Sequence, residues 1–250
     1  MKRYIQSAVV NDLRKKMVLI GGPRQVGKTT VALDILGGDE GHPAYFNWDY
    51  ADDRRILLAG GLPPDQPLVV LDEIHKYKHW RNFIKGLYDK KKSKISFLVT
   101  GSARLDYYRK GGDSLQGRYH YYRLHPLSVY ELNSSPSPAD LHTLLTFGGF
   151  PEPFFSQSER DWKRWQRERL ARVIHEDLVS LEQVKEVSQL DLLATMLQDR
   201  VASLLSINVL RRDLSASHEA VDRLVRILEN LYYCFRFRPF GAKRIKALKK

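Results

Sequence analysis

Hydrophobic residues recur along the first half of the chain in five short runs of β-strand character. The runs are MVLIG (17–21), AYFNW (44–48), LVVLD (68–72), ISFLVT (95–100) and RYHYYRL (118–124). Segments with helical periodicity lie between them, among them TTVALDIL and HWRNFIKGLYDKK. This alternation predicts an α/β fold, and the nearly continuous apolar character of the early runs predicts parallel strands covered by helices on both faces.

The pattern changes after NSSPSPAD (133–140), a segment rich in serine and proline that offers Asp140 as a helix N-cap. Helical periodicity dominates beyond it. We therefore expect an α/β domain over residues 1–135 and a smaller, mainly helical domain over 136–250. Within the second, INVLRRDL and HEAVDRLVRILENLYY predict two helices joined by a turn, with Ser217 as an N-cap and a strand afterwards, which is the order of a winged helix-turn-helix.

Composition and charge narrow the class of protein. The chain has 250 residues, of which 43% are hydrophobic and 28% charged, and no apolar stretch approaches the length of a membrane span. The single cysteine, Cys234, excludes an intrachain disulfide and is expected to be buried and inert, and we expect a cytoplasmic protein with no membrane partner. The net charge of +12 favours a polyanion such as DNA as a partner.

The decapeptide GGPRQVGKTT follows the first apolar run and fits the phosphate-loop pattern GxxxxGK[ST]. Glycine allows the sharp turn that points backbone amides at a phosphate, and the following helix adds the positive end of its dipole. Lys28 is expected to reach the β- and γ-phosphates, and the Thr29 hydroxyl to bind Mg²⁺. The candidate nucleotide-binding residues are Gly22, Pro23, Arg24, Gln25, Val26, Gly27, Lys28, Thr29 and Thr30.

An acidic pair ends the third apolar run, LVVLDE, where a P-loop enzyme needs a carboxylate for its metal. Asp72 is the candidate magnesium ligand beside Thr29, and Glu73 the general base that polarises water. No NKxD guanine signature is present, so adenine is the expected base, and the acidic pair favours hydrolysis over transfer to an acceptor. The sequence therefore predicts a phosphoanhydride hydrolase with ATP and Mg²⁺ as its cofactors.

Further candidate catalytic residues lie at the end of the fourth apolar run and at the start of the fifth. Thr100 or Ser102, in SFLVTGS, is placed to sense the γ-phosphate, with a polar strand end as the structural alternative. Arg118 is the candidate arginine supplied to an adjacent subunit of a homo-oligomer, and Arg104 and Arg123 are the next candidates for this role. His75 and His79 lack a helix-borne acidic partner for a zinc site and are expected to be surface or loop residues.

Five motifs in order resemble prokaryotic AAA-superfamily ATPases of the AAA-14 type that carry a DUF4143 domain. These are GGPRQVGKTT, LDEIHKYKHWRNFIKGLYDK, FLVTGSARLD, SLQGRYHYYRLHPLSVYE and GGFPEPF. The resemblance implies a P-loop NTPase with a parallel sheet in strand order 5-1-4-3-2 and the residue roles given above. Members of that family usually continue past KRIKALKK, so the resemblance leaves a short member and a truncated chain as alternatives.

The second half offers two basic elements. Residues 159–178 interleave two tryptophans with arginines and lysines, which predicts either a solvated helix with an apolar inner face or a nucleic-acid-binding face. In the winged-helix pattern, DNA contacts would fall to His218, Glu219, Arg223, Arg211 and Arg212. The leading interpretation is an ATPase that remodels or translocates DNA; the alternative is a nucleotide-regulated signalling or defence switch with slow turnover that acts through protein contacts.

Overall fold

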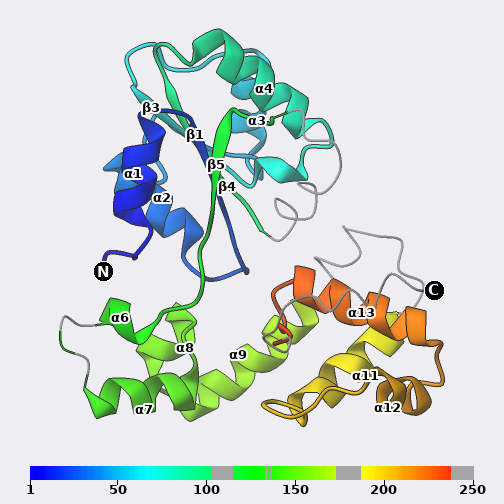
Figure 1. Ribbon diagram of the computed structural model, residues 1–250. Helices are drawn as coiled ribbons and strands as arrows, with labels where there is room; N and C mark the ends of the chain where they lie inside the picture. Colours follow the sequence, from blue (N-terminus) through cyan, green and yellow to red (C-terminus); the bar gives the residue numbers. More distant parts are fainter. Residues whose placement is uncertain (103–114, 133–134, 136, 173–186, 238–250) are drawn as a thin grey trace, which may run out of the picture. The chain divides into compact units, whose positions relative to one another are not determined.

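The computed structural model describes residues 1–102, 115–132, 135, 137–172 and 187–237 (Figure 1). The chain divides into two compact units, Met1–Gln183 and Val184–Lys250. The first unit extends beyond residue 135 and includes the helices that follow the sheet. The domain boundary at residue 135 remains a prediction.

A five-stranded parallel sheet forms the centre of the first unit. Its strands are β1 (Met17–Gly21), β2 (Tyr45–Asn47), β3 (Leu68–Asp72), β4 (Ser96–Thr100) and β5 (Tyr119–Arg123). They pair in the order β2-β3-β4-β1-β5, which is the predicted order 5-1-4-3-2 counted from the other edge. The predicted α/β fold with a parallel sheet is therefore confirmed, and each strand lies inside its predicted range.

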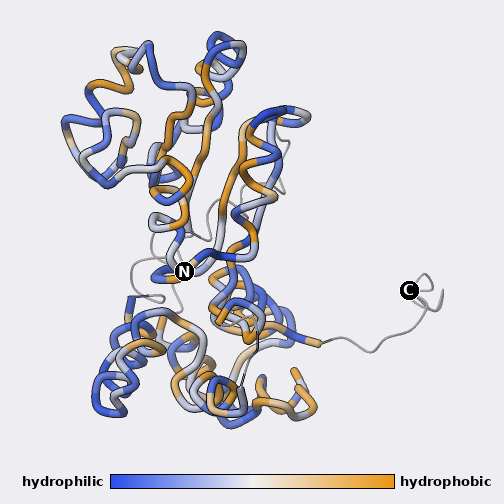
Figure 2. The backbone as a smooth tube through the Cα atoms, turned by 90° about the vertical axis from the view of Figure 1, so that its left-hand side faces the viewer, coloured by the Kyte–Doolittle hydropathy of each residue, from blue (hydrophilic) through white to orange (hydrophobic). Residues whose placement is uncertain are grey.

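Helices cover both faces of this sheet because alternate strand residues point to opposite sides. Val18, Ile20 and Leu98 pack toward α1 (Gln6–Leu13) and α2 (Lys28–Leu36). Met17, Leu19 and their neighbours pack toward α3 (Ala51–Leu58) and α4 (Trp80–Lys91). Figure 1 shows the first pair of helices on one side of the sheet and the second pair on the other, and Figure 2 shows the strands between them as mostly hydrophobic chain.

Four helices follow β5 in the described part of the first unit. They are α6 (Val129–Leu132), α7 (Pro138–Phe147), α8 (Pro151–Ser156) and α9 (Glu159–Arg172). The N-cap of α7 is Ser137 and not Asp140 as expected, because the Ser137 hydroxyl accepts from the Asp140 amide while the Asp140 carboxylate reaches back in a capping box. On α9, Trp165 is buried as predicted for the inner face.

The second unit contains α11 (Val187–Gln198), α12 (Ile207–Asp213) and α13 (His218–Asn230). The predicted helix, turn and helix are present at α12 and α13, and Ser217 caps α13 by accepting a hydrogen bond from the Ala220 amide. The strand expected after α13 is absent from residues 231–237, and residues 238–250 lie outside the described part. Among the described residues, no helix is long and apolar enough to cross a bilayer.

Candidate functional site

The phosphate loop joins β1 to α2 and takes its shape from three residues with positive φ. Gly22, Gln25 and Gly27 have φ angles of 153°, 61° and 90°. A Cβ added at Gly22 would lie 2.4 Å from the Leu124 carbonyl oxygen, so this position admits only glycine. Gly27 is the N-cap of α2 and has no side chain to occupy the first helical amides, which leaves them available to an anion.

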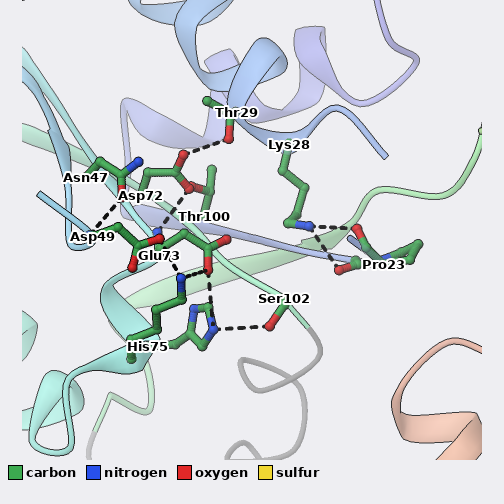
Figure 3. Close-up of polar contacts among 12 residues, drawn as sticks. Pro23, Lys28, Thr29, Asn47, Asp49, Asp72, Glu73, His75, Thr100 and Ser102 are labelled. Atoms are coloured by element: carbon green, nitrogen blue, oxygen red, sulfur yellow. Dashed lines mark hydrogen bonds and ion pairs between the residues drawn. The ribbon is translucent and has the colours of Figure 1, made fainter. Parts of the chain in front are cut away.

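Lys28, the first residue of α2, is folded back over the loop. Its side chain is buried at 7% exposure. The ammonium nitrogen Nζ donates to the carbonyl oxygens of Pro23 at 2.7 Å and of Gly22 at 3.2 Å (Figure 3). The loop carbonyls thus hold this cation at the mouth of the cradle, where phosphate oxygens would compete for the same protons.

Asp72, at the end of β3, is the centre of a buried hydrogen-bond network and is 2% exposed. Its Oδ2 accepts from the Thr29 hydroxyl at 2.7 Å and from the Tyr45 hydroxyl at 2.9 Å. Its Oδ1 accepts from the Thr100 hydroxyl and from the Glu73 amide. The structure therefore brings together the two predicted magnesium ligands and one of the two predicted sensing hydroxyls (Figure 3).

Glu73 follows in the left-handed conformation, with φ of 55°. Its Oε2 lies 3.5 Å from Lys76 Nζ and 3.7 Å from His75 Nε2. Burial, followed by the negative charge of Asp72, raises the pKa of Glu73 above its ordinary value, although Lys28, Lys76 and Arg24 act in the opposite direction. A carboxylate with a raised pKa is a stronger base than an exposed one, as proton abstraction from water requires.

His75 was expected to be a surface or loop residue; it lies on the connection between β3 and α4, but it is not at the surface, since it is only 4% exposed. Its Nε2 lies 3.1 Å from the Ser102 hydroxyl, so this imidazole sits between the predicted base Glu73 and the second sensing hydroxyl (Figure 3). The burial follows from the short 3₁₀ turn η1 (Ile74–Lys76), which turns the chain inward directly after β3. His79, in contrast, is exposed as predicted.

Lys28, Thr29, Asp72 and Glu73 line one cavity of about 730 Å³ in the first unit. One wall is the phosphate loop with α2, a second carries Tyr45, Asn47, Asp49 and Lys76, and a third comes from α8 and α9. The basic residues of α9 were expected on its outer side, but Arg169 and Arg172 line this cavity. Arg169 stacks over the Phe150 ring at 4.3 Å, and Arg172 pairs with Glu168 at 2.8 Å. A helical wheel that divides residues only into apolar and basic does not separate these two from the outward ones.

Arg118 does not lie in this cavity. It precedes β5, whose first residue pairs with Met17 at the start of β1. Arg118 therefore lies at the amino-terminal end of the strands, whereas the phosphate loop lies at their carboxyl-terminal end. Its guanidinium donates to both carboxylate oxygens of Asp89, at 2.9 and 3.1 Å. Arg123 ends β5, and Arg104 lies outside the described residues.

The donor set fits magnesium. Thr29 and Asp72 converge with oxygen atoms alone, and Mg²⁺ prefers oxygen ligands and is usually held by one or two protein groups together with phosphates. Over the described ranges, no cluster of three or more histidine, cysteine or carboxylate side chains forms an all-protein metal cage.

Two family models match parts of this chain. Residues 14–133 match the AAA_14 family, described as an AAA domain, and residues 138–250 match a domain of unknown function, DUF8612, where the resemblance had implied DUF4143. An uncharacterized protein of Mycobacterium tuberculosis is 29% identical over 173 residues, which cover 67% of this chain and 37% of the relative. One of Methanocaldococcus jannaschii is 24% identical over 259 residues, covering 91% and 58%. The chain thus spans only part of the length of these relatives.

Two solved structures show a distant likeness. The RuvB Holliday junction branch migration motor of Thermotoga maritima aligns at a TM-score of 0.39 and 16% identity, covering 90% of this chain and 84% of that one. The Aeropyrum pernix ORC1 protein in complex with DNA aligns at a TM-score of 0.40 and 13% identity, covering 93% and 84%. The family match, the motif order and the sheet order together support the assignment of residues 14–133 to the AAA-type P-loop ATPase domains.

Proposed function

We propose that this chain binds ATP with Mg²⁺ at the phosphate loop and hydrolyses it. The observation that carries the proposal is the meeting of Thr29 and Asp72, whose side-chain oxygens lie 2.7 Å apart although 43 positions separate them in sequence. Buried Lys28 and the carboxylate of Glu73 line the same cavity. An anion cradle, a cation, a metal-binding pair and a base are the parts that phosphoryl transfer to water requires.

The residues divide the work as follows. The loop amides and Lys28 bind the polyphosphate, once its oxygens replace the carbonyls of Gly22 and Pro23 around the ammonium group. Thr29 and Asp72 would hold Mg²⁺, which neutralises charge on the β- and γ-phosphate oxygens when bound. Glu73 accepts the proton of the attacking water. Thr100 orients Asp72 through its hydroxyl, and Ser102 contacts His75 beside the base.

The test is a comparison of binding with turnover. Calorimetry with ATP and Mg²⁺ should detect binding to the wild-type protein and to Glu73→Gln, because glutamine keeps the shape of the site without its basic oxygen. Phosphate release should fall to background in that variant only. Normal turnover in Glu73→Gln removes Glu73 as the base, and absence of nucleotide binding to the folded wild type removes the proposal as a whole.

The chain acts as a homo-oligomer in this proposal, with Arg118 serving a neighbouring subunit. Arg118 lies at the end of the strands opposite its own phosphate loop, so it cannot contact the nucleotide bound by its own subunit. Arg118→Ala and Lys28→Ala should each be inactive alone, and mixing them should restore part of the activity by forming sites with an intact loop and an intact arginine. No recovery on mixing would show that each subunit works with its own residues.

We further propose DNA as the partner, on the basis of charge. Arg211, Arg212 and Arg223 are exposed on α12 and α13. The acidic Asp222, which would oppose a phosphate, is neutralised by Arg236 at 2.9 Å and Arg226 at 3.2 Å. Exposed cations beside a helix-turn-helix, in a chain with a net charge of +12, favour contact with a DNA backbone.

Binding of duplex DNA, measured at several salt concentrations, tests this partner. Affinity should fall steeply as salt rises, and Arg211→Gln with Arg212→Gln should reduce that slope because two phosphate contacts are lost. DNA should also stimulate ATP hydrolysis. A protein that binds ATP tightly, hydrolyses it slowly and ignores DNA would instead support the nucleotide-regulated switch.

A further inference from the structure

Arg3 is a buried arginine close to the start of the chain, at 7% exposure. Its guanidinium makes three contacts with segments far apart in sequence. Nε donates to Glu131 Oε1 at 2.7 Å, Nη1 to the Val26 carbonyl at 2.8 Å, and Nη2 to the His125 carbonyl at 2.5 Å. One side chain therefore joins the amino-terminal segment, the phosphate loop and the chain that follows β5.

The contact with Val26 fixes the direction of a loop amide. Val26 lies between Gln25 and Gly27, both at positive φ, where small rotations would turn the peptide groups. In a planar trans peptide the carbonyl and the following N–H point in opposite directions. When Arg3 holds the Val26 carbonyl, the Gly27 N–H must point away from the guanidinium. A Cβ added at Gly27 would lie 3.6 Å from Arg3 Nη1, which shows how closely the guanidinium covers this peptide.

Glu131 holds the guanidinium in place. Its carboxylate also accepts from the Tyr4 amide at 3.1 Å and from the Ser128 amide and hydroxyl at 3.0 and 3.1 Å. The side chains of Arg3 and Glu131 are 6% and 1% exposed. A charge pair removed from water in this way is retained only where every partner is present, and loss of one partner is costly. Arg3 lines the cavity of the site, whereas Glu131 does not.

We propose that Arg3 is a positioning residue of the phosphate loop, held by Glu131, and that together they set the Gly27 amide for a polyphosphate. The inference rests on the proposed nucleotide function of this site. It assigns to Glu131, which does not line the cavity, a measurable effect on nucleotide affinity. The amino-terminal segment and the segment after β5 thereby become part of the binding apparatus.

The experiment compares Arg3→Gln, Glu131→Gln and Arg3→Lys with the matched control Glu229→Gln. Glu229 also pairs with an arginine, Arg236, at 2.6 Å, but belongs to the second unit. Two quantities are measured on the full chain: the hydrogen exchange of the peptide spanning residues 22–30 without nucleotide, and the dissociation constant for ADP with Mg²⁺. Urea unfolding of each variant separates local from global effects.

Arg3→Gln and Glu131→Gln should each accelerate exchange in that peptide and weaken ADP binding by about tenfold, the loss of one hydrogen bond to a charged group. The KM for ATP should rise, whereas a purely structural defect lowers the active fraction at unchanged KM. The double variant should be no worse than either single one, because both break the same contact. Arg3→Lys keeps the charge but cannot make all three hydrogen bonds, so its loop exchange and ADP affinity should lie between those of the wild type and Arg3→Gln.

Loop exchange and ADP affinity like those of Glu229→Gln would overturn the inference and leave the nucleotide function intact. Failure of the wild type to bind ADP would overturn both, and the two failures are distinguishable in the same titration. Should Glu131→Gln not fold, Arg3→Lys decides on the same readouts: wild-type exchange and affinity count against the inference, and intermediate values support it.

Discussion

The hydrogen bonds at Asp72 lead to a prediction that does not depend on nucleotide. Replacing Asp72 by Asn keeps its size but turns one of two accepting oxygens into a donor. The Glu73 amide cannot reorient, so the remaining oxygen should stay at the Oδ1 position, and the amide nitrogen should face the hydroxyls of Thr29 and Tyr45. Thr29 can turn toward water, whereas the Tyr45 side chain is buried and its proton loses its acceptor.

The magnitude follows from these contacts. A hydrogen bond to a charged group contributes about 1.5–3 kcal/mol to stability. Asparagine also spares the desolvation of a buried carboxylate, which offsets part of that loss. Asp72→Asn should therefore lower the free energy of unfolding by about 1.5 kcal/mol, near the lower end of that range. Tyr45→Phe removes the donor from the same bond, so the two changes should couple by about 1–2 kcal/mol in a double-mutant cycle.

Urea unfolding followed by tryptophan fluorescence is the assay. All tryptophans, Trp48, Trp80, Trp162 and Trp165, belong to the first unit, so the signal reports on the unit that contains Asp72. Asp52→Asn is the matched control, because Asp52 pairs with Arg55 while 79% of its side chain is exposed, and no measurable change is expected. Additive losses in the cycle would refute the bond between Asp72 and Tyr45 as a source of stability.

Three further predictions concern single side chains. Because the pKa of Glu73 is raised in the folded protein, its contribution to stability is complete below its ordinary pKa of 4.5 and is lost as pH rises through the folded value. Measured without nucleotide, the free energy of unfolding should therefore fall less steeply above pH 4.5 in Glu73→Gln than in the wild type. An unchanged pH profile would contradict this. Burial, with Glu229, raises the pKa of Cys234 to about 11, so iodoacetamide at pH 8 should react far more slowly than with a free thiol; equal rates would count against it. Ser217→Ala should destabilise α13 by about 1 kcal/mol in thermal unfolding, whereas Ser217→Asp should not.

The central strands β1, β3 and β4 were predictable because they are buried on both faces. An apolar run of five residues bounded by turns has few interpretations once several such runs alternate with helical periods. All residues of β1 are buried, and the run MVLIG marks its bounds. The strand expected after α13 is not found over residues 231–237. Aromatic residues there, such as Phe235 at 75% exposure, are not buried between two layers as the residues of β1 are.

Long-range partners were not predictable from one sequence. Arg3 and Glu131 are 128 positions apart, and each alone is an ordinary charged residue. His75 follows an acidic pair and precedes two lysines, a setting typical of a solvated loop, and only the inward turn of η1 buries it. Arg169 differs from its basic neighbours on α9 in what lies opposite the helix and not in its own periodicity.

The geometry of a parallel sheet explains why three distant motifs could nevertheless be assigned to one site. The carboxyl ends of parallel strands share one edge, and functional residues gather where strands end there. The order β3-β4-β1 places β4 between the strand that ends in Asp72 and the strand that leads into the phosphate loop. Thr100, at the end of β4, therefore reaches Asp72, and Thr29 reaches the same carboxylate from beyond β1. A residue at a strand end is located by this rule alone, whereas one outside the strands, such as Arg3 in the amino-terminal segment, requires the folded chain.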